Sequence, residues 1–151
     1  AAQQPVLSGR AVGGVVRWLR QLHRFLILHE ADRLSAAAGV PPSLTRAVIW
    51  QESKGTPVAT REKDGTTVYG VMQVKPGTAE QMGWRGSDPR ALMNVPGVYY
   101  GVRYLAWQLE RYDGDTRRAL MAYNGGTADP DNPRQVAYAD AVLAAQREGR
   151  P

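Results

Sequence analysis

Ala47-Val-Ile-Trp-Gln-Glu-Ser53 is a short apolar helical stretch that ends on a carboxylate, and the rest of the chain is expected to fold around it. Val48 lies one turn before Glu52 and Ile49 lies beside it, which places the carboxyl group at the edge of the buried face. Apolar surroundings disfavour the charged form of a carboxyl group and raise its pKa. Such a group can donate a proton near neutral pH, so Glu52 is a candidate general acid, although many helix-end glutamates are merely solvated.

Length and composition favour one domain. The chain has 151 residues, 43% of them hydrophobic, which suits a single core of ordinary size. It has no cysteine, which excludes disulfides and thiolate metal sites, and His23 and His29 have no acidic cluster nearby. We therefore expect no metal and no cofactor. The net charge of +5 favours a polyanionic partner: nucleic acid, a membrane surface or an anionic cell-wall polymer.

The first part of the chain is expected to be a leader followed by a basic helix. Residues 1–14 are small and polar and lack the regions of a signal peptide, and no run of 18 apolar residues predicts a membrane span. From Val15 to Leu26, apolar residues fall on one helix face and arginines on the other. This pattern fits a helix that packs on its own domain, which is the commoner case, or one that docks on a membrane or a protein partner.

The remaining pattern predicts a mainly α-helical fold. Further helices are expected over about 27–38, 44–52, 78–82, 97–112, 115–124 and 133–145, and the first of these could continue the basic helix. The Asp64-Gly65 turn between extended flanks predicts a small hairpin within 59–68. The total is five to seven helices with at most one small hairpin, in a single domain spanning 15–151.

Three ordered blocks carry a resemblance to a known family. They are Glu52-Ser53 at the end of an apolar helix, Gly70-Val-Met-Gln73 followed by Pro76, and Ala122-Tyr-Asn-Gly125. Gly70 in the second block would allow a close backbone approach. With these blocks the chain, from about Phe25 to Ala145, resembles the catalytic domain of soluble lytic transglycosylases, in the superfamily of goose-type lysozyme. The resemblance implies a lysozyme-like fold beside whose catalytic cleft the hairpin lies.

The resemblance also implies a reaction and a set of site residues. Glu52 would be the single acid/base that cleaves peptidoglycan between N-acetylmuramic acid and N-acetylglucosamine, leaving a 1,6-anhydromuramoyl end. The tyrosine of the third block, Tyr123, would point its hydroxyl group toward this carboxyl group. The other implied substrate-binding residues are Ser53, Met72, Gln73, Asn124 and Tyr138. Ser53, Met72, Asn124 and Tyr138 also fit a structural role in a helix end, the core or a turn.

The segment before the second block departs from the family pattern. It contributes Glu62 and Asp64, which lie where true lysozymes carry a second carboxylate. If either projects into the cleft, the enzyme would hydrolyse its substrate and act as a muramidase. Asp64 before Gly65 also fits a simple turn residue.

Three functions thus remain open: a lytic transglycosylase, a hydrolysing muramidase, and a non-catalytic glycan-docking module of a secretion or virion assembly. The expected partner is peptidoglycan, with no nucleic acid, in a monomer that acts in the periplasm or elsewhere outside the cytoplasm. The Val15–Leu26 helix is a candidate attachment to a secretion, conjugation or virion complex.

Overall fold

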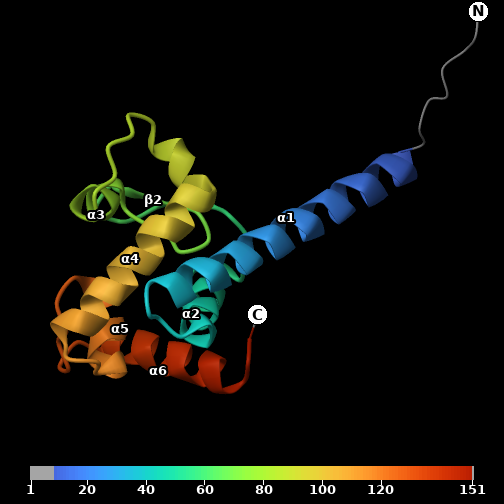
Figure 1. Cartoon of the computed structure of the whole chain (residues 1–151). Helices are drawn as coiled ribbons and strands as arrows, with labels where there is room; N and C mark the ends of the chain where they lie inside the picture. Colours follow the sequence, from blue (N-terminus) through green and yellow to red (C-terminus); the bar gives the residue numbers. More distant parts are fainter. Residues whose placement is uncertain (1–8, 151) are drawn as a thin grey trace, which may run out of the picture.

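Six α-helices, a 3-10 helix and a two-stranded sheet make up residues 9–150, which the computed structural model describes (Figure 1). In chain order these are α1 (Gly9–Ala37), α2 (Pro42–Ser53), β1 (Ala59–Arg61), β2 (Thr67–Tyr69), α3 (Pro76–Gln81), the 3-10 helix η1 (Pro89–Met93), α4 (Val95–Arg111), α5 (Thr116–Gly125) and α6 (Pro133–Arg147). The prediction of a mainly α-helical fold with five to seven helices and a small hairpin is confirmed.

Helix α2 lies in the middle of the core. Both α1 and α6 pack against it, and its residues Leu44, Val48 and Ile49 are no more than 1% exposed. A proline in the first turn favours the start of this helix. Its end is set by Lys54, which adopts the left-handed conformation with a φ of 55° and donates its N–H to the carbonyl of Trp50. The predicted buried stripe is confirmed, and Glu52 falls in the last turn of α2.

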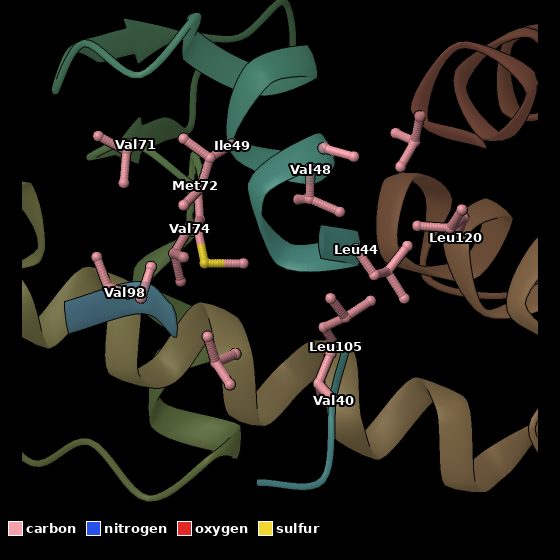
Figure 2. Close-up of a cluster of buried hydrophobic side chains, with 14 of the residues drawn as sticks. Val40, Leu44, Val48, Ile49, Val71, Met72, Val74, Val98, Leu105 and Leu120 are labelled. Atoms are coloured by element: carbon pink, nitrogen blue, oxygen red, sulfur yellow. The ribbon is translucent and has the colours of Figure 1, made fainter. Parts of the chain in front are cut away.

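The loop after β2 enters the core beside α2 and α4. Val71, Met72 and Val74 are all buried there, and Figure 2 shows them facing the other core side chains. The Met72 side chain lies against Gly101 of α4, where an added Cβ would come within 2.7 Å of the Met72 sulfur. The loop is therefore held in place by close packing, which fixes the second sequence block relative to α2.

Two glycines enclose the carbonyl oxygen of Leu92 in η1. An added Cβ would lie 2.4 Å from that oxygen at Gly70 and 1.9 Å from it at Gly97. Gly70 also has a φ of 80°, which side chains rarely permit. The predicted close approach at Gly70 is confirmed, and it lets the loop after β2, η1 and the start of α4 meet.

The predicted hairpin is confirmed. Strands β1 and β2 pair antiparallel, with Thr60 opposite Val68, and the turn between them contains Gly65 with a φ of 85°. Asp64 accepts hydrogen bonds from the backbone N–H and the hydroxyl group of Thr66. The hairpin thus has a defined turn, and it presents the acidic residues of the predicted segment beside the end of α2.

Helix α1 is one continuous helix of 29 residues, as the sequence allowed, but it differs from the prediction in two ways. It begins at Gly9, so residues 9–14 are helical where a loose leader was expected; residues 1–8 lie outside the described part. Its first half projects from the body of the molecule (Figure 1). The preferred expectation that Val15–Leu26 packs on its own domain is wrong, because the apolar residues of that segment are exposed. Within residues 9–150 no helix is long and apolar enough to cross a membrane.

Candidate active site

Glu52 lies in a polar cleft of about 910 Å³ between the hairpin side of the molecule and helices α4 to α6. The last turn of α2 delivers the carboxyl group, and the residue is only partly exposed. The cleft is lined by Glu52, Thr60, Arg61, Glu62, Lys63, Asp64, Val68, Gln73, Val74, Lys75, Thr78, Tyr104, Tyr123, Asn124, Gly125, Gly126, Asn132, Arg134 and Gln135. Many of these residues are polar, and they come from several elements along the chain, which suits an extended ligand with many hydroxyl groups.

The environment of Glu52 keeps a proton on it near neutral pH. Burial disfavours the carboxylate and raises the pKa of Glu52 to about 7, and the nearby negative charge of Glu62 acts in the same direction. A hydrogen bond from Tyr138 and the positive charge of Arg134 oppose this rise. Near neutral pH Glu52 can therefore hold a proton, as a general acid requires.

Tyr138, on α6, takes the place that was predicted for Tyr123. Its hydroxyl group donates a hydrogen bond to Glu52 Oε1 at 2.6 Å, whereas the Tyr123 hydroxyl group donates to the carbonyl of Met72 at 3.0 Å. Burial raises the pKa of both tyrosines well above the usual value, so both remain neutral donors. The position of the Glu52 carboxyl group is thus set by α6, and Tyr123 instead holds the loop after β2.

Asn124 presents an unpaired acceptor. Its side chain lines the cleft, and its Oδ1 atom is buried without a hydrogen-bond partner within residues 9–150. An unsatisfied buried amide oxygen is costly, unless a ligand supplies a donor. Asn124 therefore lies at the cleft with an acceptor that its own chain does not satisfy, and its binding role stays a prediction.

Three of the predicted binding residues make mainly structural contacts. The Ser53 hydroxyl group donates to the carbonyl of Val71 at 2.8 Å and lies outside the cleft lining, while the Met72 side chain is fully buried in the core. Gln73 does line the cleft, but its side-chain amide donates to two backbone carbonyls, those of Val58 and Gly70. Ser53 and Gln73 thus fasten the loop after β2 to its surroundings.

Both candidate second carboxylates line the same cleft as Glu52, and both pair with one lysine. Lys75 Nζ lies 2.8 Å from Glu62 and 3.3 Å from Asp64. Hydrogen bonds from Thr66, together with Lys75, lower the pKa of Asp64 to about 2. Asp64 is therefore ionised at neutral pH, and both of its oxygens already have partners: Oδ1 accepts from Thr66 in the turn, and Oδ2 pairs with Lys75.

Sequence reasoning did not assign Tyr104, Arg134 or Lys75 to the site. Tyr104 lines the cleft, packs between Trp107 and Tyr123, and accepts a hydrogen bond from Gln108 at 2.8 Å. Its position at helical spacing from apolar residues of α4 gave only a weak signal. Arg134 and Lys75 bring positive charge to the cleft from helix starts far apart in the sequence, which no local pattern reveals. Within the described chain, no three His, Asp or Glu side chains are grouped to hold a metal ion.

Replacing Tyr138 by Phe is expected to shift the pH dependence of the site. The hydrogen bond from Tyr138 favours the carboxylate, so its loss raises the pKa of Glu52 further. The loss of activity on the alkaline side then moves to higher pH, while the maximal rate falls about fivefold, as expected for one hydrogen bond. Rates of peptidoglycan cleavage, the activity that the resemblance implies, test this when measured across pH, with Tyr99→Phe as a control on the exposed face of α4. An unmoved alkaline limb would contradict the assigned role of Tyr138.

Comparison with known proteins gives a consistent set of similarities. Residues 31–142 match the family model described as the transglycosylase SLT domain. The peptidoglycan transglycosylase of Escherichia phage T7 is 35% identical over 123 residues, covering 79% of this chain and 9% of the relative. The transglycosylase of Enterobacteria phage PRD1 is 37% identical over 94 residues, covering 62% of this chain and 32% of the relative. An endo-type membrane-bound lytic murein transglycosylase A of Klebsiella pneumoniae is 31% identical over 126 residues, covering 79% and 54%.

A solved structure shows the same fold. It is an inactive mutant of the lytic transglycosylase Slt from Pseudomonas aeruginosa, with a TM-score of 0.69 at 21% identity, covering 80% of this chain and 23% of that chain. This confirms the lysozyme-like prediction for the fold. This chain spans little more than half, or less, of the length of these relatives.

Proposed function

Because this chain belongs to the transglycosylase SLT domain family, we propose that it is a peptidoglycan lytic transglycosylase with Glu52 as its single general acid/base. It would cleave the β-1,4 bond between N-acetylmuramic acid and N-acetylglucosamine. One observation carries this proposal. Glu52 is a partly buried carboxyl group in a polar cleft, and its pKa is raised to about 7.

In the first step Glu52 protonates the glycosidic oxygen. The bond between the muramoyl C1 and that oxygen breaks, and the N-acetylglucosamine side leaves as an alcohol. Proton donation avoids an alkoxide leaving group, and a carboxyl group with a pKa near the working pH does this best. Positive charge then develops at C1, where the carbonyl oxygen of the substrate's own N-acetyl group can stabilise it.

In the second step Glu52, now a carboxylate, takes a proton from the C6 hydroxyl group of the same muramoyl residue. The C6 oxygen forms a bond to C1, which yields a 1,6-anhydro end and restores the proton on Glu52. Water is not consumed. The Tyr138 hydroxyl group, 2.6 Å from Glu52 Oε1, would hold the carboxyl group in one orientation through both steps. Asn124 would accept a hydrogen bond from the substrate.

The partners of Asp64 and Glu62 favour this route over hydrolysis. A hydrolysing enzyme needs its second carboxylate free to activate water or to stabilise C1. Asp64 is instead held by Thr66 and Lys75, and Glu62 by Lys75. These contacts support a turn role for Asp64, and they leave Glu52 as the carboxyl group available for proton transfer.

Mass spectrometry of muropeptides released from purified peptidoglycan tests the product. The native chain and an Asp64→Asn variant should both release products that are one water lighter than hydrolytic ones. The variant should lose less than about tenfold in rate, because Asp64 takes no part in proton transfer. Reducing ends that disappear in Asp64→Asn would instead identify a muramidase. An absence of any product from the native chain would support a module that only docks on glycan.

The setting follows from the substrate. Peptidoglycan lies outside the cytoplasm, so we propose a periplasmic or otherwise extracytoplasmic site of action for a monomer whose partner is the glycan strand. Two relatives are phage proteins, which supports delivery by a virion as one setting, beside a secretion or conjugation complex. The exposed Val15–Leu26 segment is available for attachment to such a complex.

A further inference from the structure

Residues 9–26, which we call the projecting half of α1, carry most of the exposed large hydrophobic side chains of the described chain. Eight of the twelve large hydrophobic side chains that are exposed within residues 9–150 belong to this one helix. Trp18 is 60% exposed and Phe25 is 64% exposed, so even the largest of them have little cover. These eight side chains are called the apolar stripe: Val12, Val15, Val16, Trp18, Leu19, Leu22, Phe25 and Leu26.

The apolar stripe faces away from the rest of the domain. Each residue turns an α-helix by about 100°, which places the stripe on the side of α1 opposite to the side that the domain covers. The covered side is formed by Ile27, Leu28, Ala31 and Ser35, which are all buried. Because α1 is one unbroken helix, the stripe cannot reach its own domain unless the helix breaks. Its cover must therefore come from outside this domain.

The charge around the apolar stripe is entirely positive. The first 29 residues contain no Asp or Glu, and the first acidic residue is Glu30. Arg10, Arg17, Arg20 and Arg24 lie on the polar face of the same half of the helix, and none of them forms an ion pair within residues 9–150. Arg24 packs against Gly55, just after the end of α2, while the other three precede it along α1. The segment therefore combines a wide apolar face with uncompensated positive charge.

We propose that the projecting half of α1 lies along the surface of an anionic phospholipid membrane. The apolar stripe would enter the boundary between headgroups and acyl chains, and the arginines would reach lipid phosphates from the polar face. Trp18 suits this boundary, because its ring is apolar and its N–H group can remain in the polar layer. This binding is independent of the proposed cleavage reaction, since none of these residues lines the cleft.

Charge complementarity favours a membrane over a second copy of the chain. Helices that pair in water usually carry opposite charges that attract each other, and two copies of this part of α1 would have none to offer, because no acidic residue precedes Glu30. The apolar stripe also covers about half of the helix circumference, which is wider than the seam buried between two helices. An anionic lipid surface can match both the width of the face and its charge.

Cosedimentation of the full chain with vesicles tests the proposal. Vesicles of phosphatidylcholine that contain phosphatidylglycerol should bind the chain, vesicles of phosphatidylcholine alone should bind it much less, and added salt should weaken the binding. The triple variant Trp18→Ala/Leu22→Ala/Phe25→Ala should lose binding by more than about tenfold. Alanine favours the helix, so circular dichroism should show unchanged helix content.

A matched pair of arginine variants measures how much the positive charge of α1 contributes to vesicle binding. Arg17→Gln should weaken vesicle binding about fivefold, and Arg147→Gln, an exposed arginine near the end of α6, should leave it unchanged. All variants should digest dispersed peptidoglycan as the native chain does, which separates failure of this proposal from failure of the proposed function. Equal binding to both kinds of vesicle, or full binding by the triple variant, would overturn it. So would sedimentation of the native chain as a dimer that the triple variant abolishes, without vesicle binding.

Discussion

Glu52→Gln is expected to lower the rate of peptidoglycan cleavage by about a thousandfold or more. A glutamine side chain cannot donate a proton to the glycosidic oxygen, and general acid–base catalysis contributes about 10² to 10⁴ in rate. Here one residue would serve both as the acid and as the base, so the loss affects two proton transfers. The substitution nearly preserves size and retains an acceptor for the Tyr138 hydroxyl group. The measurement is the rate of muropeptide release by each protein.

The control for this variant is Glu80→Gln, the same substitution at an exposed position of α3 outside the cleft. It should retain full activity. Circular dichroism and glycan-pulldown assays should show that Glu52→Gln still folds and still binds peptidoglycan. If the variant folded and cleaved glycan at the native rate, Glu52 would not be the acid, and the proposed mechanism would fail.

Gly97→Ala is expected to destabilise the domain by about 2 to 3 kcal/mol or more. The new Cβ would lie 1.9 Å from the Leu92 carbonyl oxygen, and overpacking against backbone typically costs this much even after some relaxation. Leu92 cannot move away easily, because its side chain is fully buried and its carbonyl oxygen also lies close to Gly70. For a domain of this size the midpoint of thermal unfolding should fall by roughly 6 to 10 °C.

Gly77→Ala in α3 provides the matched control. A Cβ added at Gly77 meets nothing within 4 Å, and alanine favours helices over glycine, so the unfolding temperature should stay constant or rise slightly. Differential scanning calorimetry of both variants decides the matter. Equal unfolding temperatures for the two variants would mean that the Leu92 carbonyl group is not confined as described.

The helices and Glu52 could be predicted because their signals are local. The buried stripe of α2, the capping residues Asp115 and Asn132, and the Asp64-Gly65 turn all act within a few residues of their own position. Each of these local preferences agrees with the final fold. The placement of Glu52 at the edge of an apolar helix face also follows from helical spacing, whereas its catalytic role was inferred from the resemblance of the three sequence blocks.

The partner of Glu52 could not be predicted in the same way. Tyr138 lies 86 residues after Glu52, and whether it or Tyr123 reaches the carboxyl group depends on how α6 crosses α2. Both tyrosines are largely buried, and both lie on helices that contribute to the cleft, Tyr123 on α5 and Tyr138 on α6. A resemblance of sequence blocks therefore does not show which of the two contacts Glu52. Only the packing of three helices decides that Tyr123 points to the Met72 carbonyl instead.

The prediction that Val15–Leu26 of α1 packs on its own domain was wrong for a related reason. An amphipathic pattern says that one face needs cover, but it does not say what supplies the cover. In this chain the buried face of the second half of α1 is turned away from the apolar stripe, and that relation depends on where the helix meets α2 and α4. The sequence pattern was correctly recognised, and the expected cover was wrong.

The position of Glu52 at the end of α2 favours catalysis but makes the folded state less stable when the carboxyl group is ionised. The carboxyl end of a helix carries a partial negative charge, so the last turn is an unfavourable place for a carboxylate, in addition to burial. With a pKa raised from 4.5 to about 7, the folded state holds the proton more tightly than the unfolded chain. The resulting stabilisation is full below about pH 4.5 and is lost as pH rises through about 7. Evolution toward a more stable domain would therefore tend to remove the group that gives the domain its chemistry.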